Sequence, residues 1–379
     1  MKHGQILSPK CILFITTGLG TGGAEAMLVR VISHLRDVGH NIVVVNLTTL
    51  RDQQGSLEKI SVVVYNAPFS KPIVALSTLW NVRKQMKSNQ TLAIIGWMYA
   101  GNLVAFFLRS YFSKKTRLIW SVRQSLDFWE GNKTTTKCMI WLNSKLSGLV
   151  DCVLFNSHLS SVQHQKFGFQ GENHVVVANG FELPSYVKVA ESRAKQRKQI
   201  GLNGSEILLG VVGRFHPVKG HRLLSEAWQL VKTEKPELTS SVYLCVVGDK
   251  VPEGWHDQDL FRDNVYLFDK HSDAISLMCA FDGLILPSYA EAFPNVVGEA
   301  MSVGLPVIAS DVGDVKLILP PENFIFPRGD VFELKRKIEE FLALGVEERL
   351  IIGEQNRKII NNDYNIKNVT NAYKRAFGL

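Results

Sequence analysis

The sequence has few cysteines and no long hydrophobic run. Its five cysteines, Cys11, Cys138, Cys152, Cys245 and Cys279, are scattered and form no C-x-x-C pair, so we expect small buried residues in a reducing compartment rather than a disulfide framework or a zinc site. No uncharged apolar segment approaches the ~20 residues that span a bilayer. The start "MKHGQILSPK" lacks the apolar core, about 7–15 residues long, of a secretion signal. These features predict a folded, cytoplasmic chain.

The length favours two domains. A single core usually stops growing at roughly 250–300 residues, and this chain has 379. Its 46% apolar and 21% charged residues are typical of an ordinary globular protein.

Positive charge is concentrated in the N-terminal half. Residues 1–185 contain 19 Lys and Arg against 9 Asp and Glu, a net +10, whereas residues 186–379 contain 24 against 26, a net −2. Such an excess suits an anionic partner such as nucleic acid, a lipid headgroup or a pyrophosphate-linked substrate, although a merely basic surface gives the same count.

Short apolar runs alternate with helical patterns along both halves. In the first half the runs are 10–16, 41–47, 61–66, 92–97, 117–123, 152–156 and 174–179, and in the second half 207–215, 242–249, 264–269, 282–288 and 306–311. This alternation predicts an α/β fold with mostly parallel sheets that are covered on both faces.

The tract 181–206 interrupts the alternation. It contains Pro184 and is charged and weakly apolar, so we interpret it as the interdomain linker and the lead-in to the second domain. We expect domains at 1–185 and 186–360, followed by a polar helix at 361–379 that packs back on the N-terminal domain.

The stretch "TTGLGTGGAE" contains a G-x-G-x-x-G made by Gly18, Gly20 and Gly23. A dinucleotide-binding domain also needs an acidic residue at the end of the second strand to hold the ribose, and Asn46 stands there instead. The Gly22-Gly23 pair indicates either an anion site at a helix N-terminus or a tight strand-to-helix turn.

In the second half, "VVGRFHPVKG" places Arg214 just after a strand and Lys219 five residues later, at the start of a helix. Two cations beside a glycine turn suit a diphosphate, although surface cations at a strand end would give the same pattern.

The segment "PSYAEAFPNVVGEAMSVG" carries the most specific pattern. Glu291 and Glu299 are separated by seven residues, the first in a loop and the second in the helix that follows. A loop carboxylate suits sugar hydroxyls and a helical one suits a ribose diol. The free N–H groups of Phe293, Asn295 and Val296, in the turn that also contains Pro294, suit a phosphate. Helix capping or a salt bridge remains the alternative role.

Five segments follow one another along most of the chain: "GLGTGGAE", "FNSHLSSVQHQKFGF", "VVVANGFEL", "VVGRFHPVKG" and "LPSYAEAFPNVVGEAMSVGLPVIASDVGDVKLIL". They resemble the retaining nucleotide-sugar glycosyltransferases of family 4. The resemblance implies the B-type glycosyltransferase fold (GT-B), in which two Rossmann-like domains face each other across a cleft and the last helix crosses back.

The resemblance also implies roles for individual residues. Glu291 would contact the donor sugar, Glu299 the ribose, Arg214 and Lys219 the diphosphate, and Gly22-Gly23 the donor phosphate and the acceptor side. With retention of configuration, the acceptor hydroxyl attacks the face from which the nucleoside diphosphate leaves. Neither a metal nor a cofactor is then required, since the nucleotide-sugar is a substrate, and family habit favours UDP over GDP.

One segment departs from the family pattern. Many members carry a histidine after the strand that here reads "RLIWSVRQSLDFW", and this sequence has Arg123-Gln124-Ser125. Arg123 or Gln124 is the candidate for the acceptor or sugar contact.

The remaining histidines near these motifs receive minor roles. His158 and His164 lie six residues apart, on different faces of a helix, and are expected at the surface. His216 and His221 flank Lys219 and are expected to serve as turn and capping residues.

The acceptor side is suggested by residues 101–117, where four aromatic residues are interleaved with four basic ones. Such a helix suits contact with anionic lipid, and a core helix with a cationic end is the alternative. Together with the basic half, it suggests a peripheral enzyme on the inner face of the cytoplasmic membrane, acting on a lipid-linked or saccharide acceptor in surface polysaccharide or lipopolysaccharide biosynthesis.

Two other functions would account for parts of the same sequence patterns. A nucleic-acid-binding protein would use the basic half, but the sequence has no aromatic RNA platform or DNA-binding motif. An NAD-dependent oxidoreductase would use the glycine stretch, and Asn46 argues against it.

Overall fold

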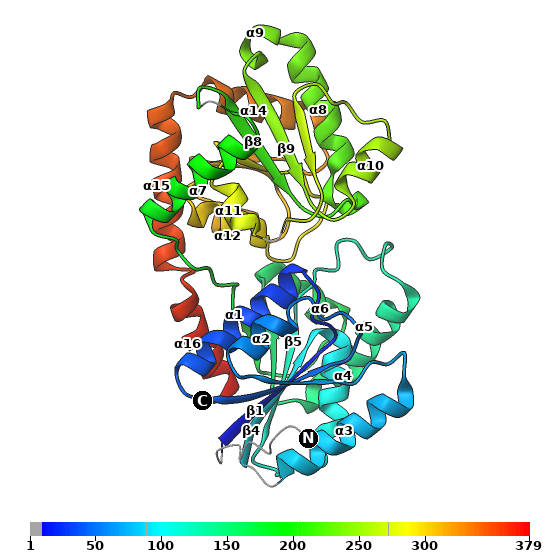
Figure 1. Ribbon diagram of the computed structural model, residues 1–379. Helices are drawn as coiled ribbons and strands as arrows, with labels where there is room; N and C mark the ends of the chain where they lie inside the picture. The colour runs from blue at the N-terminus through cyan, green and yellow to red at the C-terminus, as the bar shows by residue number, and fades with distance from the viewer. Residues whose placement is uncertain (1–9, 88–89, 203, 272) are drawn as a thin grey trace. The chain divides into compact units, whose positions relative to one another are not determined.

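The computed structural model describes residues 10–87, 90–202, 204–271 and 273–379, which form two compact units (Figure 1). Unit 1 runs up to Gly180 and includes Ile366–Leu379, and unit 2 is Phe181–Asn365. The sequence analysis placed these boundaries at 185/186 and 360/361. Most of the N-terminal stretch that bears on a secretion signal lies outside the described residues.

The described part of unit 1 contains a parallel sheet of seven strands in the order β3-β2-β1-β4-β5-β6-β7. The strands are β1 (Lys10–Thr16), β2 (Asn41–Asn46), β3 (Val63–Asn66), β4 (Gln90–Trp97), β5 (Arg117–Val122), β6 (Cys152–Phe155) and β7 (His174–Val176). The helices are α1 (Gly23–Asp37), α2 (Gln54–Lys59), α3 (Pro72–Lys87), α4 (Met98–Arg109), α5 (Thr134–Leu146), the 3₁₀ turn η1 (Ser147–Leu149), α6 (His158–Phe167) and α16 (Ile366–Phe377).

Successive side chains of β1 point to opposite faces of this sheet, as strand geometry requires. Ile12 and Phe14 pack against α1, α2 and α16 on one face. Cys11, Leu13 and Ile15 pack against α3, α4 and α5 on the other. Both faces are therefore covered, which explains why the strands are apolar throughout.

The described part of unit 2 contains a second parallel sheet, in the order β10-β9-β8-β11-β12-β13. Its strands are β8 (Ile207–Val212), β9 (Val242–Val247), β10 (Val265–Phe268), β11 (Gly283–Leu286), β12 (Val307–Ser310) and β13 (Phe324–Phe326). The helices are α7 (Tyr186–Gln199), η2 (Pro217–Lys219), α8 (His221–Glu234), α9 (Pro236–Thr239), α10 (Val251–Asp257), α11 (Ala274–Met278), α12 (Asn295–Ser302), α13 (Val315–Ile318), α14 (Val331–Ala343) and α15 (Val346–Asn362).

Each sheet reverses its strand order once, beside its first strand. In both units the chain builds three strands outward on one side and then returns to build the rest on the other, so the order changes between β1 and β4 and between β8 and β11. In open parallel sheets, ligands bind outside the carboxyl ends of the strands at such a switch point. Each unit therefore has one edge where a site is expected.

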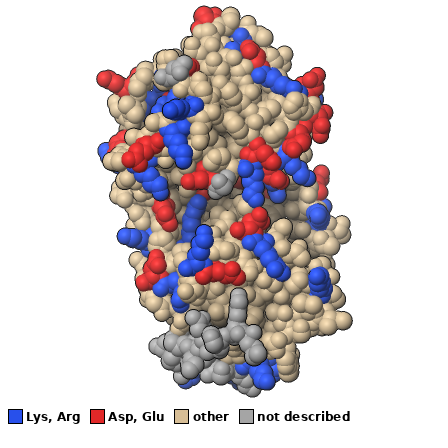
Figure 2. All heavy atoms as spheres, in the orientation of Figure 1, with Lys and Arg blue, Asp and Glu red and all other residues tan. Residues whose placement is uncertain are grey.

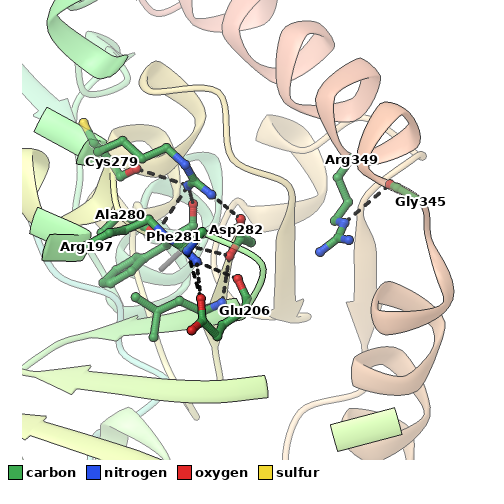
Figure 3. Close-up of polar contacts among 11 residues, drawn as sticks. Arg197, Glu206, Cys279, Ala280, Phe281, Asp282, Gly345 and Arg349 are labelled. Carbon is green, nitrogen blue, oxygen red and sulfur yellow. Dashed lines mark hydrogen bonds and ion pairs between the residues drawn. The ribbon is translucent and has the colours of Figure 1, made fainter. Parts of the chain in front are cut away.

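The tract interpreted as a linker is largely helical, which corrects that part of the sequence analysis. Residues 186–199 form α7, whose arginines hold it to the rest of unit 2 (Figure 3). Arg197 donates to the carbonyl oxygens of Ala280 and Glu206 and pairs with Asp282 at 3.1 Å. Arg193 pairs with the same carboxylate at 2.6 Å. Polar contacts rather than an apolar stripe anchor this helix. The hydrophobic pattern of the sequence therefore did not predict it.

The cysteines are nearly all buried, as predicted, but Cys138 is exposed on α5. Burial raises the pKa of Cys11 and of Cys152 to about 11, which keeps both thiols protonated. Among the described residues, no helix is both long and apolar enough to cross a bilayer.

Candidate donor site at the switch point of unit 2

The candidate site is built from two loops at the carboxyl ends of β8 and β11. These neighbouring parallel strands end at Val212 and Leu286, so residues 213–220 and 287–294 emerge at the same sheet edge. The backbone N–H of Tyr289 donates to the carbonyl oxygen of Val218 at 2.7 Å, which ties the two loops together. The switch point thus joins the motifs that carry Lys219 and Glu291.

Lys219 and Glu291 form an ion pair at this edge. The Nζ atom of Lys219 lies 2.6 Å from Oε1 of Glu291, and the Oγ of Ser288 donates to the same oxygen at 2.8 Å. The side chains of Lys219 and Glu291 are 25% and 13% exposed, so the pair is partly buried but accessible to a ligand. Two residues that are far apart in the sequence therefore form one charged group that a ligand can contact.

Gly220 fixes where Lys219 lies. Its φ of +69° is in the left-handed region, and a Cβ built there would lie only 1.9 Å from the carbonyl oxygen of Pro287. Just before it, the side chain of His216 accepts a bond from the N–H of Val218, which confirms the predicted capping role. Backbone geometry thus sets the start of α8 and the lysine beside it.

His221 supports the strand end that carries Arg214. It is buried and stacks on Phe215 at 4.9 Å, and its Nε2 donates to the carbonyl oxygen of Arg214 at 3.1 Å. Burial, followed by the charge of Lys219, lowers the pKa of His221 to about 4, so the ring is neutral at neutral pH. The Arg214 residue itself is exposed at the sheet edge.

Helix α12 carries the second glutamate. It begins at Asn295 after Pro294, and Glu299 lies half-buried within it. The ring of Phe293 is buried and stacks on Phe181 at 6.2 Å, so it packs rather than faces solvent. Asn295 and Val296 are half-buried in the first turn of the helix.

The glycine loop belongs to unit 1, where Gly22 is the N-cap of α1. Both Gly22 and Gly23 are exposed. A Cβ built on Gly22 would lie 2.5 Å from Oε2 of Glu25, so the carboxylate of the first turn folds back over the helix start. An anion bound at this N-terminus would have to displace that carboxylate.

The position that tests for dinucleotide binding is occupied by a structural amide. Asn46 is fully buried, and its Nδ2 donates to the carbonyl oxygen of Leu50 at 2.9 Å and to Oδ1 of Asn66 at 3.0 Å. The side chain that would have to hold a ribose is therefore committed to its own loop.

The structure separates the two candidates for the acceptor contact. Arg123 is buried, with its guanidinium 4.4 Å over the ring of Trp97, and it donates to the Tyr373 hydroxyl at 2.7 Å and to Oδ1 of Asn179 at 2.6 Å. Gln124 is half-buried and donates to Oδ1 of Asn132 at 2.8 Å. Of the two, Gln124 is the more accessible.

The surface location predicted for His164 is wrong. Its ring is fully buried between Tyr99 and Phe169, and Nε2 lies 2.7 Å from the Tyr99 hydroxyl. Burial lowers its pKa to about 4. A polar residue six positions into a mostly polar helix gave no sign of burial. His158 is exposed, as predicted.

Sequence reasoning missed Ser288 and Tyr373. Ser288 precedes Glu291 by three residues, a spacing that could have suggested the bond, whereas nothing local links Tyr373 to Arg123. Among the described residues, no group of three or more His, Cys, Asp or Glu side chains is placed to hold a metal ion.

Comparison with known families and proteins adds independent evidence. Residues 192–359 match the family described as Glycosyl transferases group 1. The chain is 27% identical over 205 residues to the capsular polysaccharide biosynthesis glycosyltransferase CapM of Staphylococcus aureus, covering 51% of this chain and 52% of that protein. The curated relatives are matched over only 28% to 60% of their length.

Two solved structures share the fold over nearly the whole chain. Anabaena Alr3699/HepE, solved in complex with UDP-glucose, is 20% identical with a TM-score of 0.79, covering 97% of this chain and 99% of that one. WaaG, a glycosyltransferase involved in lipopolysaccharide biosynthesis, is 17% identical with a TM-score of 0.72, covering 98% of this chain and 100% of that one. The fold is therefore that of GT-B glycosyltransferases.

Proposed function

We propose that the protein transfers a sugar from a nucleotide-sugar, with UDP as the favoured base, to a saccharide or lipid-linked acceptor. The match of residues 192–359 to the family described as Glycosyl transferases group 1 supports this proposal. The observation that carries the proposal is the Lys219–Glu291 pair at the switch point of unit 2, which offers one cation and one hydrogen-bond acceptor at a sheet edge.

In this proposal, binding of the donor separates Lys219 from Glu291 and gives each side chain a new partner. A diphosphate carries more negative charge than a carboxylate and attracts the ammonium of Lys219 and the exposed guanidinium of Arg214. Glu291, still held by Ser288, then accepts hydrogen bonds from the sugar hydroxyls. Glu299 on α12 binds the ribose, and the first N–H groups of α12 contact a phosphate.

The proposed reaction retains the configuration at the anomeric carbon. The acceptor hydroxyl oxygen bonds to that carbon as the bond to the diphosphate oxygen breaks, and the hydroxyl proton passes to a leaving phosphate oxygen. Lys219, Arg214 and the helix N–H groups stabilise the charge that develops on the leaving group, which usually supplies a large share of the rate. No protein nucleophile and no cofactor enter this scheme.

Unit 1 is proposed to receive the acceptor at its own switch point, with Gln124 and the Gly22-Gly23 turn as contacts. The names of the relatives support a role in surface polysaccharide or lipopolysaccharide assembly. In the segment proposed to meet the inner face of the cytoplasmic membrane, Phe107 and Tyr111 are 66% and 49% exposed, whereas Phe106 and Phe112 pack against the core.

The test is thermal stabilisation of the purified protein by UDP, GDP, ADP, CMP, NAD and a panel of UDP-sugars. A ligand that binds only the native state raises the midpoint by mass action. A shift with one nucleoside diphosphate and its sugars is expected, and it identifies the base. A shift with NAD alone would overturn the proposal in favour of an oxidoreductase, and salt-dependent binding of DNA without any nucleotide shift would favour a nucleic-acid-binding protein.

A further inference from the structure

Helix α3 of unit 1 has an apolar stripe on the side that faces away from the protein. Ile73, Leu76 and Trp80 recur at helical spacing and are 83%, 69% and 61% exposed. A surface helix normally presents polar residues there. Three large apolar side chains in one row therefore point to a contact outside the described chain.

The stripe is not needed to hold α3 in place. The opposite face already packs on the core through Ala75, Val82 and Met86, which are at most 4% exposed. The helix thus has two apolar faces, and the fold uses only one of them.

Arg83 connects the stripe to a second element. Its guanidinium lies 4.5 Å from the ring centre of Trp80 and 4.0 Å from that of Tyr111, which follows α4. We call Ile73, Leu76, Trp80, Arg83 and Tyr111 the α3 patch. It contains aromatic, aliphatic and cationic groups, a combination typical of surfaces that enter a membrane interface.

The chain around the α3 patch carries charge of one sign. Between Glu58 and Asp127 the sequence has ten Lys and Arg residues, of which Arg123 is buried, and no Asp or Glu. In Figure 2 the lower right of the drawn face, where Figure 1 places α3, is mostly tan with some blue and no red. A surface of this charge attracts anionic lipid, and each basic residue near the membrane strengthens the attraction.

We propose that the α3 patch docks on an anionic membrane surface, with the three stripe residues inserted among the headgroups and the surrounding cations paired with lipid phosphates. This inference rests on the proposed action at a membrane, but its apolar stripe lies on a helix outside the aromatic segment that suggested it, and only Tyr111 belongs to both. A second copy of the chain fits less well, because a two-fold interface places the same cations opposite one another.

The experiment is co-sedimentation of the full chain with vesicles of phosphatidylcholine alone and with vesicles of equal parts phosphatidylcholine and phosphatidylglycerol. The wild type is expected to bind the anionic vesicles. The triple variant Ile73→Ser, Leu76→Ser, Trp80→Ser should bind them roughly tenfold or more weakly, because it removes the apolar insertion. The charge variant Arg83→Gln, Lys84→Gln should lose several-fold and become less sensitive to salt.

A matched control is available on α15 of unit 2, where Val346, Leu350 and Ile351 are 67%, 65% and 59% exposed. Replacing these three by serine should leave vesicle binding unchanged. Equal binding by the α3 variant and the wild type would overturn the inference. So would a dimer that forms without lipid and is lost in the α3 variant, since the occupant would then be a second copy.

The vesicle assay is independent of the proposed activity, because it requires no donor. The UDP-induced thermal shift is measured on the same variants. Loss of vesicle binding with an intact UDP shift is the expected result for the α3 variant. A wild type that binds UDP but no vesicles would overturn this inference alone, whereas one that binds vesicles but no nucleotide would overturn the proposed function alone.

Discussion

The two units share a strand order around the switch point. The cationic side chain near that point is partly exposed in unit 2 and buried in unit 1. In unit 2 the ammonium of Lys219 pairs with Glu291 where solvent reaches both. In unit 1 the guanidinium of Arg123 is buried against Trp97 and bonded to the neutral oxygens of Tyr373 and Asn179. Among the described residues, no carboxylate pairs with Arg123.

The difference shows which charge is available to a ligand. An ion pair at a partly exposed edge can exchange one anion for another, because the incoming group restores the charge balance that the outgoing group leaves. A buried cation surrounded by hydrogen-bond acceptors cannot be withdrawn without leaving those acceptors unsatisfied. We therefore propose that the lysine binds the ligand and that the arginine has a positioning role.

The largest expected effect comes from removing the carboxylate of the Lys219–Glu291 ion pair. Glu291→Ala should lower the turnover of donor and acceptor by about 100- to 1000-fold, the usual loss for one electrostatic contact at a reacting centre. The midpoint temperature of thermal unfolding should stay near that of the wild type. The control is Glu226→Ala, which removes an exposed carboxylate from the same unit. Near-normal turnover would contradict the site.

Removing the cation should act on binding rather than on turnover alone. Lys219→Ala takes away a charge-assisted bond and should weaken UDP affinity about 10- to 100-fold, measured by titration calorimetry. Arg222→Ala, which changes an exposed cation three residues later on α8, serves as the control. An unchanged dissociation constant would mean that Lys219 only holds Glu291.

Low pH should weaken both units by the same mechanism. His164 in unit 1 and His221 in unit 2 have folded pKa values of about 4 against an ordinary 6.5, so the unfolded chain takes up protons first as the pH falls. The stability that the two neutral rings contribute is fully present above pH 6.5, the ordinary pKa. It is lost as the pH falls from 6.5 to the folded pKa of about 4. Each histidine should cost about 2 kcal/mol of unfolding free energy by about pH 5.

Denaturant titration across this range is the measurement. His221→Gln should remove the part of the pH dependence that comes from unit 2 and leave the part from unit 1. A stability that does not change with pH between these limits would show that the two rings are not held neutral.

The smallest effect tests the positioning role of the buried cation. Tyr373→Phe deletes the hydroxyl that accepts from Arg123 and should cost about 1–2 kcal/mol of stability, with UDP affinity unchanged. In Tyr186→Phe, the lost hydroxyl belongs to an exposed tyrosine and donates to the half-buried carboxylate of Glu354, so that control should change little. A loss of UDP affinity in the Tyr373 variant would break the contrast between the two units.

Much of the fold was predictable because apolar runs report burial directly. The alternating strands and helices gave both sheets, and the two glutamates gave the edge of unit 2 that carries them. Helix α7 was not predictable, since Arg193 and Arg197 anchor it through carbonyl oxygens and a carboxylate rather than through an apolar stripe.

The sequence named candidate residues for the site but not how they are arranged. The resemblance predicts a diphosphate contact for Lys219 and a sugar contact for Glu291, and nothing in the sequence showed that these two side chains pair with each other. It also left Arg123 as a ligand contact, because the residues that enclose it come from distant segments, among them Asn179 and the C-terminal Tyr373.

Unit 1 is made of two pieces of chain, and this sets the order in which the protein is completed during synthesis. Tyr373 and Phe377 of α16 belong to its core, where Phe377 meets Phe14 at 5.9 Å. All of unit 2 is translated between these partners. The half that leaves the ribosome first must therefore wait, with part of one sheet face uncovered, until the other half has been made.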